Sequence, residues 1–513
     1  MKEEGNSTDI FTLIKGLSST EKSYYTKMAK RHADQNSSLH LKLFKLIDQS
    51  KIPDDNKFCK ALGIKNKIHF SGLKTYLYKD LLNTIVFQKK NNSIDTQLYF
   101  IQDQIQLLLE KRLLYLAHKV CKKAIALATK YGKYHFLITL LHQQNRILEY
   151  KDYKQFKALT EPMFSTLEQA INDHKSFAQI RFLYEKVKNL TYRSWLPITS
   201  EELVGIKEAK LLLETIKPEK SRQTLVYLYY LNSLALCQYM LHENNSCNRS
   251  CRKIFDLWSN NTHLVNEYAL LFINSVNTAC YNDFAGKNIL KVQETITAYD
   301  KLESNHLKNE FYSGHFEVIR FNTELKIYLK TARYDEVKMT IEKHAPVIFS
   351  YVSKILPPAE QLSVLSSVCI SYFILEQWDD SERLLNQIKE QNQQINREDV
   401  LYFSLLFQLV ILYEENELDR LNSAIKAAYH FLYARKKLRP FERELMLFLK
   451  HLSGAITKRT TRDLIKRFLN QLDKYRDDPH TNLYFLYFNY YGWLESKIMR
   501  ISYKDYVSQK LED

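Results

Sequence analysis

The sequence predicts an all-α fold, a right-handed α-solenoid of antiparallel helical hairpins with an N-terminal helical cap. From about Lys111 onward, an apolar helix, a short polar turn and an amphipathic helix with small residues recur at intervals of roughly forty residues. The chain also has only 10 glycines and 9 prolines among 513 residues, which argues against a turn-rich β architecture. Its 45% hydrophobic and 26% charged residues are enough for a folded core.

The repeat is visible when its turns are aligned. Ala117 and Cys121 follow the first turn at positions that Ser381 and Leu385 occupy after a later one. The same spacing predicts further turns in the middle of the chain, at Trp195–Pro197, His242–Ser246 and Phe284–Lys287. Each predicted unit is a pair of helices that buries its apolar face against its neighbours.

The repeat resembles the tetratricopeptide family, and Lys330–Val337 is the closest match to that family's turn and second helix. The resemblance extends over about Gln97–Asp473. The units depart from the family pattern because they are longer than its 34 residues and most lack its signature glycine and closing proline. The resemblance supports the architecture of the array and carries over no ligand.

The N-terminal block predicts a separate bundle of helices. Ser19 or Thr20 starts one helix, and Pro53–Asp55 interrupts the chain before a helix over Lys57–Leu62. Between them, spaced apolar residues predict an amphipathic helix, namely Leu39, Leu43, Phe44 and Ile47.

A helix-turn-helix-like segment follows within this block. The helix ending at Gly63 is succeeded by an Ile68–Phe87 helix, with basic residues near its start, namely Lys65, Lys67, His69 and Lys74. In a DNA reader, such residues would contact bases and phosphates. A capping bundle gives the same pattern, because glycine commonly ends helices. If the segment reads DNA, the chain resembles bacterial regulators that join such a domain to peptide-sensing tetratricopeptide repeats.

Several first helices of the repeat are almost free of charge. Gln223–Leu241, Leu362–Leu375 and Val400–Tyr413 have this character, as does Asn482–Leu494 near the C-terminus. The first of these reaches the length of a membrane span but contains polar residues such as Asn232 and Gln238, which are costly in lipid. We therefore expect helices packed by neighbours on most sides, and no membrane span.

The net charge of +16 is concentrated at the two ends. Residues 1–90 contain 17 Lys and Arg against 9 Asp and Glu, and residues 431–476 contain 13 against 4. Such blocks are typical of proteins that bind acidic partners such as nucleic acid, although solvated helix faces also carry charge. The candidate patch in the C-terminal block consists of Arg435, Lys436, Lys437, Arg439, Arg443, Lys458, Arg459, Arg462, Lys466 and Arg467.

Motifs for catalysis are missing from the sequence. Phosphate-binding loops need closely spaced glycines, and the nearest pair here is Gly63 and Gly72. One conceivable zinc cluster comprises Cys237, His242, Cys247 and Cys251, but its spacing matches no common zinc finger, and packing cysteines are the alternative. We expect no metal, no cofactor and no enzymatic activity.

The sequence thus predicts a non-enzymatic scaffold or adaptor that binds a protein or peptide partner on a concave surface. The alternative is a nucleic-acid-binding regulator that uses the two basic blocks. The expected segments are a basic cap over 1–92, the repeat array over 93–476 and capping helices over 477–513. The seven scattered cysteines and the absence of a signal peptide favour the cytoplasm. Some of the 35 tyrosines, including the Tyr484–Tyr491 cluster, would line the core and others the concave surface.

Overall fold

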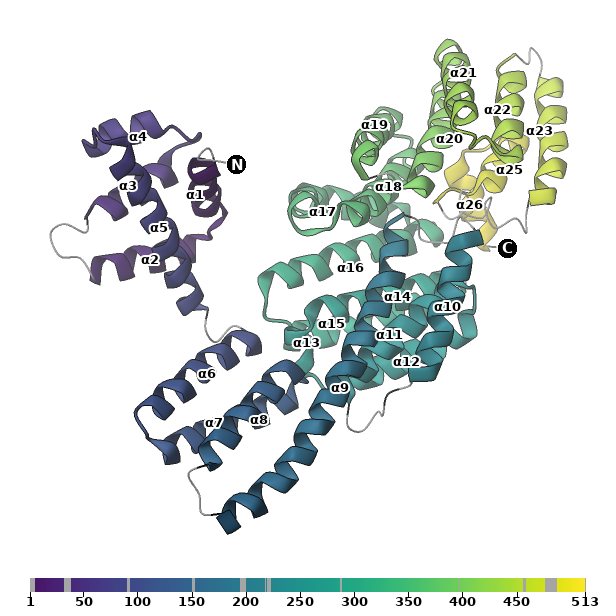
Figure 1. The fold of residues 1–513 in the computed structure, drawn as a ribbon. Helices are drawn as coiled ribbons and strands as arrows, with labels where there is room; N and C mark the ends of the chain where they lie inside the picture. Colours follow the sequence, from purple (N-terminus) through teal and green to yellow (C-terminus); the bar gives the residue numbers. More distant parts are fainter. Residues whose placement is uncertain are drawn as a thin grey trace. The chain divides into compact units, whose positions relative to one another are not determined.

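The computed structural model describes residues 5–31, 38–89, 93–149, 153–193, 200–216, 218, 223–286, 288–395, 397–454, 458–475 and 487–512, and every regular element in these ranges is helical. The all-α prediction is therefore confirmed. The chain divides into two compact units, Met1–Ile171 and Asn172–Asp513 (Figure 1). Unit 1 thus contains the expected N-terminal cap together with the first helices of the expected array.

The N-terminal helices of unit 1 share one apolar core. α5, the longest, contacts α1, α2 and α3 and contributes Leu77 and Leu81, both fully buried. Ser18 and Glu21 cap α2 reciprocally, one residue before the predicted start, and Asp54 caps α4 as the Pro53–Asp55 break predicts. The helices of this bundle are α1 (Gly5–Gly16), α2 (Ser19–Arg31), α3 (Ser38–Gln49), α4 (Asp55–Leu62) and α5 (Lys67–Gln88).

The second part of unit 1 packs α7 between two neighbours. Small residues allow this close approach: Ala117 and Cys121 are fully buried, and the Cys121 thiol donates to the Leu140 carbonyl at 3.3 Å. The helices are α6 (Ile94–Glu110), α7 (Leu114–Lys130) and α8 (Tyr134–Leu148), and α9 (Tyr153–Arg193) begins in unit 1 and ends in unit 2.

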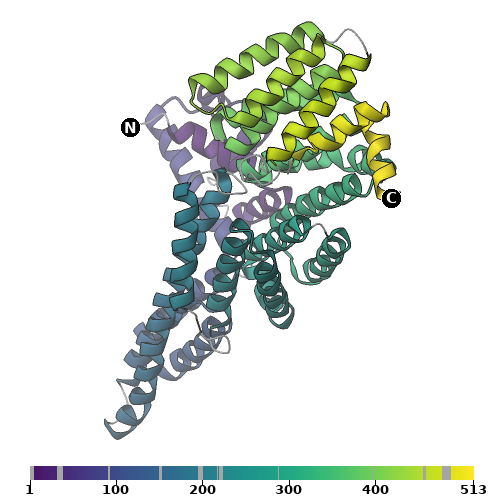
Figure 2. The ribbon, with the colours of Figure 1, turned by 90° about the vertical axis from the view of Figure 1, so that its right-hand side faces the viewer.

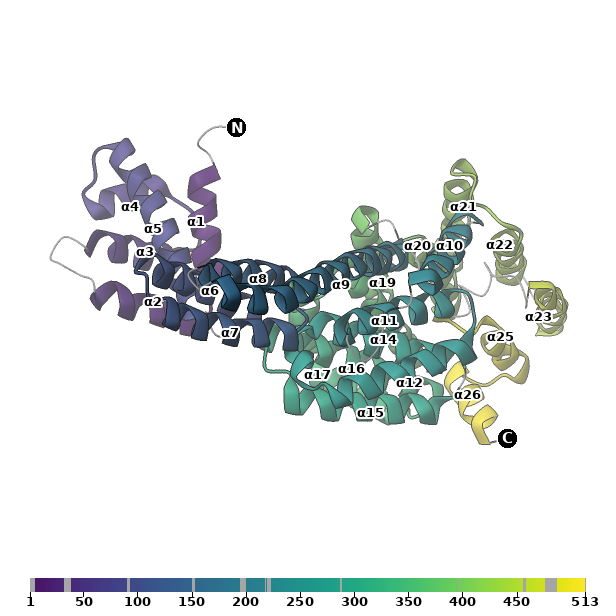
Figure 3. The same cartoon turned by 60° about the horizontal axis from the view of Figure 1, so that its bottom comes forward.

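Unit 2 continues as successive pairs of helices (Figures 1 and 3). Each first helix contacts its own second helix and also the first helix of the following pair, so α11, α14, α16, α18, α20 and α22 form one continuous row. The pairs are α11 (Thr224–Met240) with α12 (Asn244–Asn260), α14 (Ala269–Ala285) with α15 (Ile289–His306), α16 (Glu310–Lys330) with α17 (Tyr334–Ile355), α18 (Pro358–Ile374) with α19 (Trp378–Ile395), α20 (Glu398–Glu414) with α21 (Leu418–Ala434), and α22 (Pro440–Ser453) with α23 (Lys458–Leu472).

Four further helices and a 3-10 turn complete unit 2. α10 (Ser200–Ile216) precedes α11, and the short α13 (His263–Glu267) lies between α12 and α14. After α23 come the 3-10 turn η1 (Asp473–Tyr475), α25 (Tyr490–Met499) and α26 (Tyr503–Glu512). Figure 2 shows these last two helices, in yellow, beside the light green helices of the final pairs.

Most turns within pairs have one and the same structure. A residue with φ between 52° and 60° follows the first helix at Arg112, His242, Ala332, Glu376 and Asn416. At Glu376, for example, its N–H donates to the Phe373 carbonyl while that of Gln377 reaches Tyr372, the bond pattern of a Schellman helix end. The left-handed conformation is thus adopted without the family's glycine. The predicted turn at 242–246 begins at such a left-handed residue, His242. The predicted turn at 284–287 lies at the α14–α15 junction, where Gly286 has φ −73° and residue 287 is outside the described residues, as is Trp195–Pro197.

The uncharged first helices are buried on nearly all sides. In α18 and α20, runs such as Leu362–Cys369 contain only buried residues, because each helix lies between two first helices and two second helices. No helix in the described ranges combines the length and apolarity needed to cross a membrane. These uncharged runs therefore form the core of unit 2.

Small residues at the contacts within pairs provide a test of this packing. Ser381 is fully buried, and its hydroxyl donates to the Cys369 carbonyl at 2.9 Å. We expect Ser381→Leu to destabilise unit 2 by about 1–3 kcal/mol through overpacking. Tryptophan fluorescence during urea unfolding measures this, because all four tryptophans lie beyond residue 171. The exposed Ser259, replaced in the same way, is the control; equal stability of both variants would contradict the packing.

Candidate functional site

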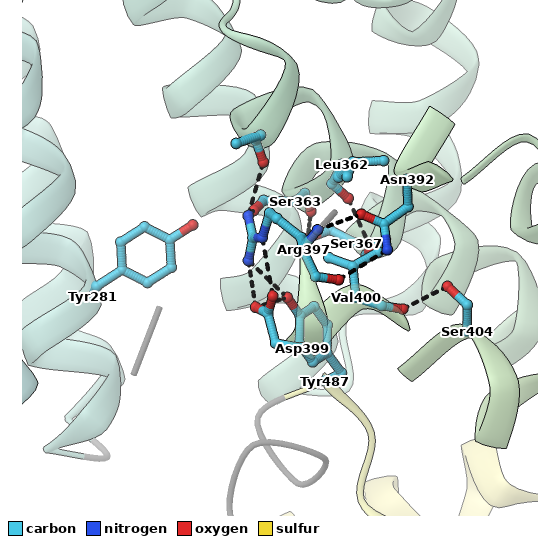
Figure 4. A network of polar contacts seen from close by, with 12 residues as sticks. Tyr281, Leu362, Ser363, Ser367, Asn392, Arg397, Asp399, Val400, Ser404 and Tyr487 are labelled. Carbon is cyan, nitrogen blue, oxygen red and sulfur yellow. Dashed lines mark hydrogen bonds and ion pairs between the residues drawn. The ribbon is translucent and has the colours of Figure 1, made fainter. Parts of the chain in front are cut away.

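Arg397 and Asp399 form a buried ion pair at the start of α20. Both side chains are 1% exposed, and Nε of Arg397 donates to Oδ1 of Asp399 at 3.0 Å while Nη2 contacts Oδ2 (Figure 4). Despite burial, the carboxylate raises the pKa of Arg397 above its ordinary value. A buried ion pair is stable only when its remaining hydrogen-bonding groups also have partners.

Those partners come from three neighbouring elements. Nη1 of Arg397 donates to the Ala359 carbonyl at 2.8 Å and to the Ser363 hydroxyl at 2.9 Å, both on α18. The Asn392 amide, on α19, exchanges two hydrogen bonds of 2.8 Å with the backbone of Arg397. The Arg397 guanidinium thus links α18 to the start of α20, and Asn392 joins the end of α19 to the Arg397 backbone.

Tyr487 completes this network from the C-terminal part of the chain. Its hydroxyl donates to Oδ2 of Asp399 at 2.8 Å and accepts from Nη2 of Arg397 at 3.2 Å. Its ring stacks on Phe403 with 4.8 Å between centroids. These bonds join residues that are nearly ninety positions apart in the sequence. We call residues 487–512 the C-terminal segment.

The rest of the C-terminal segment continues along the same row of helices. Nε1 of Trp493 donates to Glu414 of α20 at 2.6 Å, and Nζ of Lys497 pairs with the same carboxylate at 2.6 Å. Phe488 lies 5.3 Å from Phe373 of α18 and is 2% exposed. The segment also reaches the second helix α17, where Nζ of Lys504 lies 5.4 Å from the Tyr334 ring centroid. The chain's own end thus covers α18 and α20 of the row.

The earlier first helices, together with the end of α9, present a second set of polar and aromatic side chains, which we call the α9–α16 face. It consists of five half-buried residues: Lys188 of α9, Tyr229 of α11, Asn274 and Tyr281 of α14, and Lys326 of α16. Nζ of Lys188 donates to Oδ1 of Asn274 at 3.1 Å, and Nζ of Lys326 donates to the Tyr281 hydroxyl at 3.3 Å. Figure 4 shows Tyr281 facing the Arg397 network.

Burial lowers the pKa of both lysines of this face. Desolvation lowers the pKa of Lys188, and the charge of Glu360 partly opposes this change. Desolvation, with the positive charge of Arg397, lowers the pKa of Lys326 to about 8. The α9–α16 face therefore holds cations in an environment that disfavours their charge.

The residues of the predicted basic patch differ in how exposed they are and in whether the protein already pairs them. Arg435, Lys436 and Arg443 are exposed, but Nζ of Lys437 pairs with Glu398 at 2.8 Å. The half-buried Arg439 guanidinium lies 5.4 Å from the Tyr402 ring centroid. Lys437 and Arg439 thus hold the turn between α21 and α22 against α20. Arg462, Lys466 and Arg467 are exposed on α23, whereas the side chains of Lys458 and Arg459 lie outside the described residues.

The exposed part of this patch continues on α22. Phe448 stacks on Phe468 at 4.2 Å and Phe441 meets Tyr475 at 5.9 Å, so α22 and α23 run antiparallel. This register places the exposed Lys450 at the level of Lys466. We call Arg443, Lys450, Arg462, Lys466 and Arg467 the α22–α23 basic face. Within the described ranges, none of its members is paired with a carboxylate.

The helix-turn-helix-like segment forms the two predicted helices. Gly63 ends α4 with φ 68°, and Lys65, Lys67 and His69 are exposed at the start of α5. Lys74 is different, because it is 6% exposed and its Nζ pairs with Asp55 at 2.6 Å. Lys74 therefore contributes to the bundle and is not available to a phosphate. Whether the segment reads DNA stays a prediction.

The predicted cysteine cluster is only partly assembled. Cys247 and Cys251 lie 3.9 Å apart between sulfurs, and the Cys247 thiol donates to the Ala235 carbonyl at 3.3 Å. Burial raises the pKa of Cys237 to about 12, and His242 is exposed in a turn. Within the ranges described, no three His, Cys, Asp or Glu side chains gather in a way that could hold a metal ion.

A polar cavity of about 500 Å³ lies near the same turn, between the α11–α12 and α14–α15 junctions. Its buried Asp283 contacts Nζ of Lys291 and accepts from Thr295 at 2.9 Å. Glu243 at its rim pairs with Lys210 at 2.7 Å. The charges of the cavity are thus satisfied by the protein itself.

Comparisons with known proteins leave the site to be interpreted from its own geometry. Neither a protein-family model, nor a curated protein sequence, nor a solved structure matches this chain. Sequence reasoning missed Arg397, Asp399 and Lys326. One signal was present in the sequence: charged residues at 397–399 directly precede the uncharged run of α20. Charges at the start of a buried helix must be neutralised by partners, which indicates an ion pair there.

The Arg397 network leads to a stability prediction. Asp399→Ala leaves the buried guanidinium without its counter-ion, so we expect a loss of about 3–5 kcal/mol in the unfolding free energy of unit 2. Tyr487→Phe keeps the ring and removes only the hydroxyl, for which a loss of about 1 kcal/mol is expected. Urea unfolding followed by tryptophan fluorescence measures both. Equal and small losses would show that Asp399 does not neutralise a buried charge.

Proposed function

We propose that this protein is a non-enzymatic scaffold or adaptor. Its tetratricopeptide-like helix pairs would form a right-handed α-solenoid, whose concave surface is the row of first helices. A protein or peptide segment would bind along the α9–α16 face. Continuous contacts between successive first helices and the recurring Schellman turns support this architecture.

One observation carries the proposal of segment binding. The later part of the same helix row already holds a chain segment, because Tyr487, Phe488 and Trp493 insert aromatic rings against α18 and α20. The α9–α16 face offers side chains of the same kinds, with Tyr229 and Tyr281 as half-buried aromatic surfaces and Asn274 as an amide. Tyrosine provides large contact area at low entropy cost.

A display library of random peptides tests this proposal, since selection from it requires no identified partner. Peptides enriched on the full chain should lose about tenfold or more in affinity when Tyr281 is replaced by Ala, since a buried aromatic anchor contributes about 1.4 kcal/mol or more. Tyr433→Ala, at an exposed site on α21, is the control and should leave affinity unchanged. No enrichment, or binding that ignores Tyr281, would contradict the proposal.

A second candidate function is binding of nucleic acid at the α22–α23 basic face. The exposure of its five cations, without carboxylate partners in the described chain, supports a polyanionic partner. The paired Lys437 and the half-buried Arg439 would take no direct part.

Charge reversal tests this second function. Arg462→Glu, Lys466→Glu and Arg467→Glu together should strongly weaken binding of labelled DNA or RNA and reduce the slope of log affinity against log salt by up to about 3. Lys119→Glu, Lys122→Glu and Lys123→Glu, at exposed positions of α7, change the net charge equally and serve as control. Fluorescence anisotropy gives the affinities. If both triple variants lose affinity equally, overall charge and not this face is responsible.

A further inference from the structure

Lys326 is a half-buried cation without an acidic partner in the described chain. Its Nζ donates to the Tyr281 hydroxyl at 3.3 Å and lies 4.5 Å from the centroid of the same ring. Among the described residues it forms no ion pair. Most other half-buried cations of unit 2 differ in this respect, since Lys437 and Lys497, for example, each pair with a glutamate.

Asn322 lies one helical turn before Lys326 and therefore on the same side of α16. It is 9% exposed, and its Oδ1 is buried without a hydrogen-bond partner. It also contacts the Tyr281 hydroxyl, whose pKa this hydrogen bond lowers while burial raises it. Leaving a buried carbonyl oxygen without a hydrogen bond is unfavourable, so a donor supplied by a ligand would stabilise this position.

The charges around Lys326 leave a positive excess. Arg397 is neutralised by Asp399. Glu360, whose carboxylate lies 3.1 Å from the His315 ring nitrogen, acts electrostatically on Lys188 and forms no ion pair with Lys326 among the described residues. The lowered pKa of Lys326, about 8, agrees with a cation that lacks compensation. An anion at this place would remove that penalty.

We propose that the partner segment on the α9–α16 face is acidic, and that one of its carboxylates binds Nζ of Lys326 while its backbone N–H donates to Asn322 Oδ1. This inference rests on the proposed function and names the chemistry of its ligand. Tyr281 would pack beneath the carboxylate-bearing side chain.

α20, which the C-terminal segment covers, presents acidic groups where the α9–α16 face presents lysines. There, the C-terminal segment brings Lys497 to Glu414 and the Tyr487 hydroxyl to Asp399, so a cation and a donor meet acidic groups of α20. The α9–α16 face presents lysines instead. Charge complementarity thus directs the chain's own segment to one part of the row and an acidic segment to the other.

The test uses peptides enriched on the α9–α16 face, in three matched forms. The first is the acidic peptide, the second replaces each Asp or Glu by Asn or Gln, and the third keeps the acidic side chains but amidates the C-terminus. We expect the amide-substituted form to bind at least tenfold more weakly. An equal loss on C-terminal amidation alone would assign the site to a terminal carboxylate and overturn the role of an acidic side chain.

Variants of the protein then test whether Lys326 binds the carboxylate of the peptide. Lys326→Met should remove the preference for the acidic form, whereas Lys343→Met, at an exposed position of α17, should keep it. Lys326→Arg retains the charge and should retain the preference, which guards against a folding defect in the Met variant. A preference that survives Lys326→Met would overturn the inference, even if binding still depends on Tyr281. Loss of the dependence on Tyr281 would instead contradict the proposed function.

Discussion

The buried ion pair of Arg397 and Asp399 is the interaction on which the arrangement of unit 2 depends. Removing two charges from water costs several kcal/mol per ion, and attraction between them offsets this only when the remaining groups are hydrogen-bonded. Here those bonds come from Ser363 of α18 and Tyr487 of the C-terminal segment, while Asn392 of α19 bonds the Arg397 backbone. The pair therefore favours the one packing in which all four elements meet.

This constraint determines which part of the helix row is available. Because Tyr487 must reach Asp399, the following aromatic residues are placed against α18 and α20, where Phe488 and Trp493 become buried. The α9–α16 face keeps half-buried tyrosines and lysines. In our proposal, the protein's own end occupies one part of the row, and the partner occupies another whose charge is of opposite sign.

Local features of the fold were predictable from the sequence, whereas long-range contacts were not. Gly63 ends α4, Asp54 caps it, and Ala117 and Ser381 are fully buried at close helix contacts, as spacing and side-chain size indicate. The uncharged runs became first helices because only such residues tolerate neighbours on nearly every side. Tyr487 and Lys326 could not be assigned, because their environments depend on residues 45 to 90 positions away.

Hydrogen exchange of the full chain, read by mass spectrometry over residues 490–512, tests most directly whether the C-terminal segment lies on the helix row. Helices of ten residues are marginal in water on their own, so their amides are protected only by docking. We expect α25 to exchange as slowly as α20, against which Trp493 packs. Rapid exchange of α25 and α26 while α20 stays protected would contradict it.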